Sequence, residues 1–271
     1  MKIIITGAHG FIGAAMQTYF TAKGYEVLCL DHKNIPFELH GDFIIHGALS
    51  DGSDDYMSDR TLFVKLAMQN IPLIYFGSGA EFGKGMDQWL SKEDSTIDEI
   101  QLEPYSLFKL WCQDQIYLVE SDYHIVNLRL WGCFGEHDHP AHFFRAIIEE
   151  ALTTHTMTIK EPQKLMSWID VNDLCAITES FLLNWDTLKY RDYNIANHEL
   201  YPNFNWAVKI AAMLHRNPRM ILVDDTPKPR YTASIMRYCE QYQAFKKPVS
   251  FTPMEHSLRR IINYYQRLYQ K

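Results

Sequence analysis

Hydrophobic positions along the chain alternate between short continuous runs and helical repeats. Residues 3–5 are three consecutive isoleucines, and residues 11–20 then place apolar side chains at intervals of three and four. A continuous β-branched run is typical of a buried parallel strand, whereas the second spacing predicts an amphipathic helix. The order of such segments predicts an α/β fold with a doubly wound parallel sheet. Strands are expected at 25–30, 42–46, 72–76 and 124–130, and helices at 61–70 and 105–121.

Beyond residue 135 this alternation loosens. Helices are expected at 142–153, 172–183, 205–215 and 253–269, with short extended pieces between them. We therefore expect residues 1–135, with a contribution from about 166–196, to form the sheet domain. Residues 136–271 should mainly form a smaller, interwoven lobe over the carboxyl edge of the sheet, where ligands of such folds bind.

A glycine-rich turn joins the first strand to the first helix. Its sequence, T-G-A-H-G-F-I-G over residues 6–13, follows the strand directly and opens the helix. Glycines let the backbone approach a pyrophosphate, and the free amides of a helix N-terminus favour negative charge. Strand, turn and helix thus come in the order of a Rossmann dinucleotide-binding motif. The residues expected to contact the dinucleotide are Gly7, His9, Gly10, Phe11, Ile12 and Gly13.

An acidic residue ends the second strand. Asp31 lies eighteen positions after Gly13, where a carboxylate can bind an adenosine ribose and would repel a 2′-phosphate. NAD(H) is therefore favoured. NADP(H) is the alternative, because the nearby His32 and Lys33 could offset the repulsion between Asp31 and a 2′-phosphate. A solvated aspartate is the other interpretation. Only ten residues separate Asp31 from Asp42, which suggests that a strand and a helix on the adenine side are missing.

Three further residues are candidates for acid–base chemistry. Tyr105 and Lys109 are four positions apart, hence on one face of the expected helix. To exchange protons at neutral pH, a tyrosine pKa must fall from about 10 toward 7, which needs roughly 4 kcal/mol of preferential phenolate stabilisation. Lys109 and an oxidised nicotinamide could supply it. Ser78, after the strand at 72–76, should lie at the same sheet edge and could donate a hydrogen bond to a substrate oxygen; a structural serine in a tight turn is the alternative.

Composition limits the classes of protein. A chain of 271 residues with 47% hydrophobic content is typical of a globular protein, and its formal charge of −7 gives no support to nucleic-acid or membrane partners. No apolar run approaches the roughly 20 residues that span a bilayer. Met1 lies next to the first buried strand, so no signal peptide is expected. The five widely spaced cysteines favour a reducing compartment, and we expect a cytoplasmic protein.

The histidine-rich segment 136–142 suggests a metal site. His137, His139 and His142 lie beside Glu136 and Asp138, and zinc binds such side chains. Because the spacing indicates no distant fourth ligand, we favour a polar substrate or hinge loop and expect no metal.

Together these residues resemble the extended short-chain dehydrogenase/reductases, specifically the nucleotide-sugar epimerase, dehydratase and ketoreductase group. The resemblance covers nearly the whole length and includes L-R-L at 128–130, W-I-D-V-N-D-L at 168–174 and Y-N-I at 193–195. It implies NAD(P) in the sheet domain, with Ala48 near it, and a nucleotide-activated sugar between the lobes. It also implies that Tyr105 is the acid/base, that Lys109 holds the nicotinamide ribose and tunes Tyr105, and that Ser78 orients the sugar oxygen.

Departures from that group narrow the chemistry. Gly79 and Ala80 stand where its 4,6-dehydratases carry an Asp-Glu pair, so dehydration is not expected. Ala80 also replaces the cysteine of the fucose-synthase type, although the 135–142 loop is similar to that enzyme's, with His142 in place of its acid histidine. Gly132 replaces a common asparagine and Met166 a frequent arginine, which predicts a rearranged diphosphate site.

Keto reduction and 4-epimerisation remain. The leading hypothesis is NAD(P)(H)-dependent reduction of a 4-keto nucleotide sugar, in the synthesis of activated sugars or surface polysaccharides, with Tyr105 as proton donor. The alternative is an NAD-dependent 4-epimerase, which Asp31 slightly favours. A non-catalytic dinucleotide-binding regulatory protein is the further alternative. The helix at 105–121 is apolar on two sides, so one side can pack on the sheet and the other against a second subunit in a homodimer.

Overall fold

The centre of the protein is a six-stranded parallel sheet. The structure, a computed structural model, describes residues 1–31, 35–49, 56–83, 85–118 and 124–269. The strands lie in the order β2-β1-β3-β4-β6-β10, and every neighbouring pair is parallel. The α/β prediction with a parallel sheet is therefore confirmed. The strands are β1 (Lys2–Thr6), β2 (Glu26–Leu30), β3 (Phe43–His46), β4 (Leu73–Ser78), β6 (Ile125–Leu130) and β10 (Asp192–Ile195).

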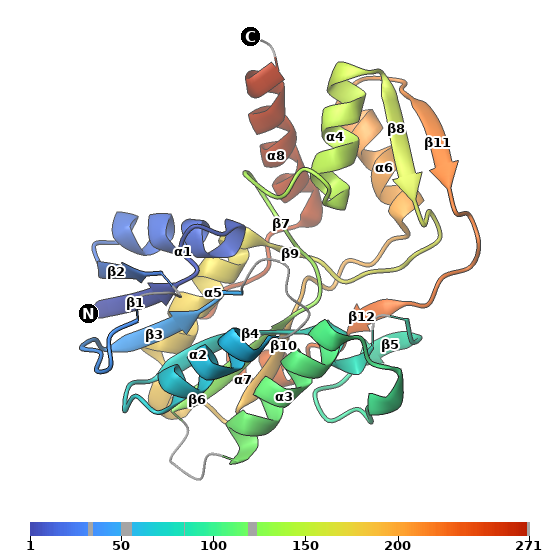
Figure 1. The fold of residues 1–271 in the computed structure, drawn as a ribbon. Helices are drawn as coiled ribbons and strands as arrows, with labels where there is room; N and C mark the ends of the chain where they lie inside the picture. Colours follow the sequence, from blue (N-terminus) through green and yellow to red (C-terminus); the bar gives the residue numbers. More distant parts are fainter. Residues whose placement is uncertain (32–34, 50–55, 84, 119–123, 270–271) are drawn as a thin grey trace.

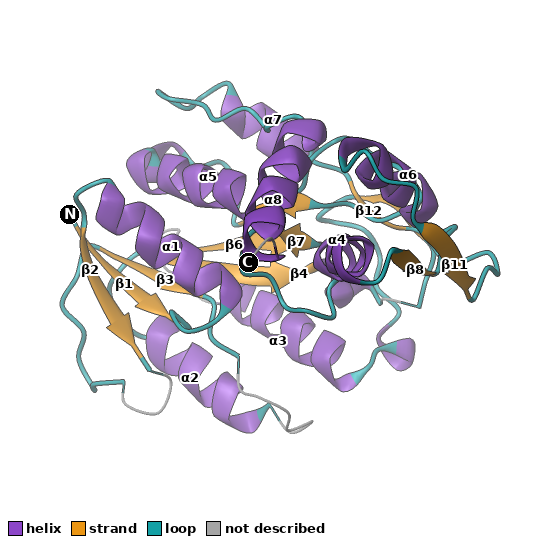
Figure 2. Cartoon of the chain, turned by 90° about the horizontal axis from the view of Figure 1, so that it is seen from above, coloured by secondary structure: helices purple, strands orange, loops and turns teal. Residues whose placement is uncertain are grey.

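Helices cover both faces of this sheet. Figure 2 shows α1 (Phe11–Ala22) and α5 (Val171–Leu183) on one face, and α2 (Met57–Ala67) and α3 (Pro104–Leu118) on the other. Right-handed crossovers between parallel strands place helices in this way. The carboxyl ends of the strands consequently meet at one edge.

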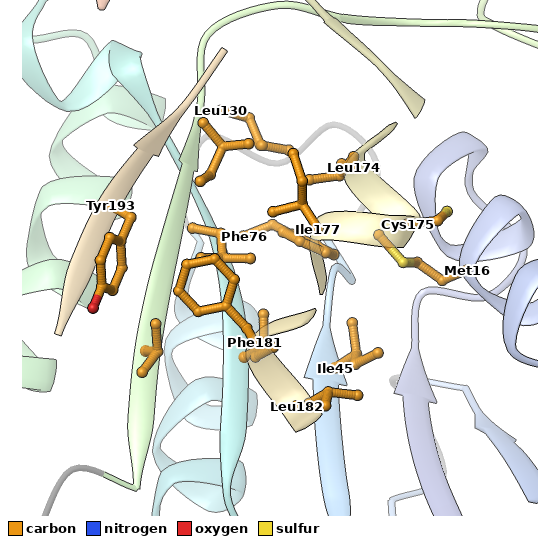
Figure 3. Packing of buried hydrophobic residues seen from close by; sticks show 14 of the residues in the cluster. Met16, Ile45, Phe76, Leu130, Leu174, Cys175, Ile177, Phe181, Leu182 and Tyr193 are labelled. Carbon is orange, nitrogen blue, oxygen red and sulfur yellow. The ribbon is translucent and has the colours of Figure 1, made fainter. Parts of the chain in front are cut away.

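The core between the sheet and α1 and α5 is continuous. Met16 of α1, Ile45 of β3, Phe76 of β4 and Phe181 of α5 are buried in one cluster (Figure 3). Burying a side chain of this size contributes roughly 1.5–3 kcal/mol relative to leaving it exposed. This packing holds the strand ends, and the loops that follow them, in fixed positions.

A smaller C-terminal lobe lies beyond the carboxyl edge of the sheet (Figure 1). Its strands β8 and β11 pair in parallel, and its own core includes Phe144, Trp206 and Leu258. The elements are α4 (Phe143–Thr153), β8 (Thr156–Lys160), α6 (Asn203–Met213), β11 (Arg219–Val223) and α8 (Met254–Tyr269).

Short elements connect the lobes. Strand β5 (Gln88–Ser91) pairs with β12 (Tyr231–Ala233), and β7 (Cys133–Phe134) pairs with β9 (Ile169–Asp170). Three short 3-10 helices are η1 (Gly79–Phe82), η2 (Glu99–Gln101) and η3 (Trp185–Thr187). These connections interweave the two lobes along the chain.

The structure also contains a helix that the sequence analysis missed. Helix α7 (Met236–Tyr242) places Tyr238 in the same core cluster as Phe181, and Phe245 joins them. This part of the C-terminal half therefore packs with the sheet domain. The division into domains 1–135 and 136–271 stays a prediction.

Element boundaries differ from the predictions by a few residues. The helix expected at 61–70 begins one turn earlier, as α2, and the helix expected at 105–121 begins at Pro104. A proline is tolerated in the first helical turn because the amide there has no intrahelical partner. The helix expected at 205–215 begins at Asn203 and ends at Met213.

The missing segment on the adenine side agrees with the sheet order. A Rossmann sheet of order 3-2-1-4-5-6 has a further strand outside the second one, whereas β2 is the edge strand here. Within the described residues, no helix is long and apolar enough to cross a membrane.

Candidate active site

The glycine turn is packed too closely for side chains at two of its positions. Gly7 has a φ of +78°, and a Cβ there would lie 2.7 Å from the backbone nitrogen of Ala48. A Cβ on Gly13 would lie 2.0 Å from the Gly7 carbonyl oxygen. The first helix thus packs directly on the turn, and the turn packs on the chain that follows β3.

The N-terminus of α1 can accept an anion. Gly10 is the N-cap residue, no side chain caps the helix, and no acidic residue lies in its first turn. The first-turn amides therefore have no side-chain acceptor, which suits a phosphate. His9, Gly10 and Phe11 also line a cavity of ≈650 Å³ between α1, α5 and α8. A dinucleotide pyrophosphate fits the turn on these grounds.

The adenine side of the turn is only partly described. Asp31 directly follows β2 and is exposed, as a ribose ligand must be. His32 and Lys33 lie outside the described residues, so their expected role stays a prediction. Ala48 is buried beside Gly7.

Lys109, Tyr105 and the end of β4 lie close together. The buried Lys109 Nζ donates a hydrogen bond to the Phe76 carbonyl oxygen at 2.9 Å. The same nitrogen lies 5.8 Å from the centroid of the Tyr105 ring and 4.6 Å from that of Tyr75. Since Ser78 ends β4 two residues beyond Phe76, the structure brings the predicted phenol, ammonium and hydroxyl to the same sheet edge.

A buried histidine lies near Lys109. His46 Nδ1 lies 2.7 Å from Thr6 Oγ1, and its ring stacks on Tyr75 at 5.6 Å. Burial and the neighbouring Lys109 charge lower the pKa of His46 to about 3. His46 is therefore neutral at physiological pH and adds no second positive charge beside Lys109.

Hydrogen bonds hold Ser78 in a capping box. Its Oγ accepts from the Ala80 amide at 3.2 Å, and its own amide donates to Glu81 Oε1 at 3.0 Å. The other oxygen of Glu81 accepts from Arg129 Nε at 2.7 Å, and both of these charged side chains are buried. The serine is thus fixed by a buried ion pair as well as by its own turn.

The residue after Ser78 has no room for a side chain. A Cβ on Gly79 would lie 2.5 Å from the ring of Trp131, and Ala80 is fully buried. The packing of this turn therefore leaves no space for acidic side chains at positions 79 and 80. Glu81, the carboxylate of this turn, is already bonded to Ser78 and Arg129.

His142 forms a pair with Asp138. It is the N-cap residue of α4, and its Nδ1 lies 2.7 Å from Asp138 Oδ1. This hydrogen bond raises the pKa of His142, against the opposite effect of burial. Asp138 is buried, and its Oδ1 also accepts from the His139 amide. The arrangement favours a protonated imidazole, although its part in a reaction stays a prediction.

The second lobe has a cavity of ≈240 Å³ between α4, β8 and α6. Its lining includes Lys160, Met166, Trp168 and Asn203, and both Trp168 Nε1 and Asn203 Oδ1 are buried without a hydrogen-bond partner. The two departures in this lobe are coupled, because a Cβ on Gly132 would lie 2.6 Å from Met166 Cε. The same Cβ would lie 2.6 Å from the Trp168 ring, so a larger residue at 132 would require both side chains to move.

Sequence reasoning missed several polar residues around these positions. Glu81, Asp138 and Tyr231 are buried, and each interacts with a predicted site residue. Ser78 and Glu81 have the spacing of a capping box, and Asp138 and His142 are four positions apart, so both contacts had a local signal. Tyr231 is brought to Ser78 by a chain crossing that no residue spacing reveals. In the part of the chain that is described, no group of three or more His, Cys, Asp or Glu side chains is placed to hold a metal ion.

The parallel sheet and the glycine turn define a dinucleotide-binding protein of the Rossmann class. The chain belongs to the NAD dependent epimerase/dehydratase family, whose profile matches residues 3–59 and 53–196. No curated protein matches it in sequence.

Solved structures with the same fold span nearly the whole chain. A dTDP-glucose 4,6-dehydratase from Bacillus anthracis in complex with NAD has a TM-score of 0.82 at 15% identity, with 98% of this chain and 97% of that chain covered. A UDP-glucuronic acid 4-epimerase from Bacillus cereus with NAD has a TM-score of 0.78 at 19% identity, with coverage of 100% and 98%. A UDP-glucose 4-epimerase from Thermus thermophilus with NAD has a TM-score of 0.72 at 15% identity, with coverage of 98% and 99%.

Proposed function

We propose that the protein reduces a 4-keto nucleotide sugar with a reduced nicotinamide coenzyme, NAD(H) being favoured. The observation that supports this most is the position of Lys109. Its ammonium lies 2.9 Å from the Phe76 carbonyl oxygen and 5.8 Å from the centroid of the Tyr105 ring, near the end of the strand that carries Ser78. A phenol, an ammonium and a hydroxyl at one sheet edge suit proton transfer to a carbonyl oxygen.

Each residue of this group has a distinct part. The glycine turn, Asp31 and Ala48 would hold the dinucleotide, which supplies the hydride when bound. The Tyr105 phenol donates the proton to the sugar oxygen, and the Lys109 charge stabilises the phenolate that remains. Ser78 donates a hydrogen bond to the same oxygen as negative charge develops on it.

The substrate class follows from the second lobe. The cavity that includes Lys160 and Trp168 is lined by two lysines and two glutamates and has two buried polar atoms without partners, which suits the polar edge of a nucleotide base. One solved structure of similar fold contains UDP-glucuronic acid and NAD. We infer that the nucleotide binds in this lobe and that the sugar extends toward Tyr105.

A 4-epimerase is the second candidate. It is favoured by Asp31, which suits NAD, and by the similar fold of the 4-epimerases with NAD. An epimerase keeps its coenzyme through oxidation and reduction, whereas a reductase releases it after each cycle. Purified protein that already contains stoichiometric NAD would favour the epimerase.

Dehydration is not proposed. Elimination of water needs its own acid and base, and Gly79 and Ala80 provide neither. The contact of Gly79 with Trp131 leaves no space for a carboxylate there.

The test is a screen of nucleotide-linked 4-keto sugars with NADH, followed by the loss of absorbance of the reduced nicotinamide. Turnover should be lost, by about 100-fold or more, in Tyr105→Phe. The control is Tyr190→Phe, which removes a phenol that bonds Glu240 at the surface. Biological activity that is unchanged in Tyr105→Phe would leave only the regulatory, non-catalytic alternative.

We also propose a cytoplasmic homodimer. Leu107 and Leu118 of α3 and Val64 of α2 are exposed apolar residues, and Leu118 is 71% exposed. Pairing of these helices with a second copy would cover them. The buried thiols of Cys112 and Cys175 suit a reducing compartment.

A further inference from the structure

Tyr231 reaches the neighbourhood of Ser78 from the other lobe. It begins the short strand β12, which pairs with β5 just after the turn that contains Ser78. No pattern in the sequence marks this position, because the chain has passed through the whole second lobe before it returns. A residue 153 positions from Ser78 thus becomes its neighbour in space.

The backbone and ring of Tyr231 are held on several sides. Its amide donates to the Leu165 carbonyl oxygen at 2.9 Å, and its carbonyl accepts from the Ser167 amide at 3.0 Å. The ring lies 4.6 Å from that of Trp131, centroid to centroid. Trp131 is also the ring that leaves no room for a side chain on Gly79. The position of the phenol is therefore fixed relative to the Ser78 turn.

The phenol itself lacks a partner. Tyr231 is 4% exposed, and its Oη is buried without a hydrogen bond, although buried polar groups are nearly always bonded. The Ser78 hydroxyl lies near enough to lower the pKa of this phenol, whereas the Tyr105 charge raises it, but Ser78 Oγ does not reach hydrogen-bonding geometry with Tyr231 Oη. Because Oη is closed to solvent, Ser78 is better placed than a substrate to become its partner.

We propose that Tyr231 is a positioning residue, whose phenol donates a hydrogen bond to Ser78 Oγ in the working enzyme. A serine hydroxyl has one hydrogen to donate and two lone pairs that accept. One lone pair already accepts from the Ala80 amide at 3.2 Å. With the Tyr231 phenol on the second, both lone pairs are filled, and the Ser78 hydrogen can only point outward to the substrate oxygen.

The protonation of Tyr231 suits this role. Burial raises its pKa well above the usual value near 10, and the Ser78 contact lowers it only in part. The phenol thus keeps its hydrogen at every pH at which the enzyme works. It can donate to Ser78 but cannot replace Tyr105 as the acid/base.

This inference rests on the proposed function, so the test has one readout that needs turnover and one that does not. For turnover, Tyr231→Phe, Ser78→Ala and the double variant are compared with the same 4-keto nucleotide sugar and NADH. Tyr231→Phe should lower kcat about tenfold with KM within about twofold, and Ser78→Ala should lower kcat about 100-fold. The double variant should match Ser78→Ala, because the phenol acts only through the serine.

The matched control is Tyr265→Phe. Its Oη is also buried without a partner, but it lies in the core of the second lobe, and its kcat should equal that of the wild type. The positioning role is wrong if Tyr231→Phe leaves kcat unchanged. It is also wrong if Tyr231→Phe lowers kcat by the same factor in the wild type and in the Ser78→Ala variant.

The second readout is a crystal structure of the unmodified protein with NAD. The distance from Tyr231 Oη to Ser78 Oγ should be about 2.6–3.0 Å. A distance above about 4 Å, with Oη bonded elsewhere, would overturn the inference even if turnover is found. Absence of turnover with every 4-keto sugar would count against the proposed function. The crystallographic distance would still show whether Tyr231 Oη donates a hydrogen bond to Ser78 Oγ.

Discussion

Gly13 faces Gly7 so closely that a β-carbon on Gly13 would lie 2.0 Å from the Gly7 carbonyl oxygen. The atoms that would clash belong to backbone, which cannot rotate away as a side chain can. The close contact joins the start of α1 to the turn that follows β1. The geometry of the predicted dinucleotide turn therefore depends on the absence of one methyl group.

The first prediction is that Gly13→Ala disrupts this turn. Separation of the helix from the turn should lower the free energy of unfolding by about 2 kcal/mol or more and abolish detectable NAD binding. Urea denaturation and fluorescence titration with NADH measure the two effects. Gly85→Ala is the control, since nothing lies within 4 Å of a Cβ at that position. If Gly13→Ala binds NADH as tightly as the wild type does, the close packing of Gly13 against Gly7 is wrong.

The second prediction concerns the ion pair beneath Ser78. Glu81→Gln removes the negative charge 2.7 Å from the buried Arg129 and leaves Asp192, at 3.4 Å, as the remaining buried carboxylate. Because a buried charge left without any partner costs about 3–5 kcal/mol, the loss here should be smaller, about 2 kcal/mol. Denaturation curves should show a loss of this size. In the control Glu255→Gln, which removes an exposed pair with Arg259, the loss should stay below about 0.5 kcal/mol. Equal stability of both variants would mean that Glu81 and Arg129 are not paired in solution.

The third prediction is a dependence on pH. Asp138 raises the pKa of His142 above its ordinary value of 6.5, so protonated His142 stabilises the folded state. Because the folded pKa is the higher one, this stabilisation is complete below pH 6.5 and is lost as the pH rises through the folded pKa.

A titration of His142 by NMR measures this shift directly. The pKa of His142 should fall toward 6.5 in Asp138→Asn, and that variant should lose stability below pH 6.5 relative to the wild type more than it does at about pH 9. An unchanged titration of His142 would show that the Asp138 contact does not form.

The fourth prediction addresses coenzyme choice. Replacement of Asp31 by Ala removes the charge that should repel a 2′-phosphate and bind the ribose of NAD(H). The ratio of the two dissociation constants should move toward NADP(H) by about tenfold, as measured by fluorescence titration with each coenzyme. Asp42→Ala, at the other end of this connection, is the control. A constant ratio would mean that the residue at 31 does not contact the coenzyme.

Much of the fold could be predicted because its signals are local. The isoleucines of β1, the glycine turn and the repeat in α1 lie within the first 22 residues, and each pattern is decided by neighbours in sequence. Five of the six parallel strands follow from the same reasoning repeated along the chain, whereas β10 lies where the alternation loosens and was not predicted. Helix α7 was missed because its seven residues span only about two turns, too few for a clear helical repeat, and no side chain caps it.

The site could be predicted only in part for the same physical reason. Tyr105 and Lys109 share a helix turn, so their proximity could be predicted from the sequence. Arg129 lies 48 positions from Glu81, and Tyr231 returns from another lobe; neither separation corresponds to any helical or strand period. Such contacts are set by packing of the complete chain.

The position of β2 at the outer edge of the sheet bears on how long a coenzyme stays bound. With no strand beyond it among the described residues, we expect the adenosine end of a dinucleotide to be open at its side and the coenzyme to dissociate faster. Rapid exchange is an advantage to an enzyme that must replace spent coenzyme in every cycle and a handicap to one that regenerates it in place. An open adenosine side would suit the proposed reduction, in which the spent coenzyme leaves after every cycle.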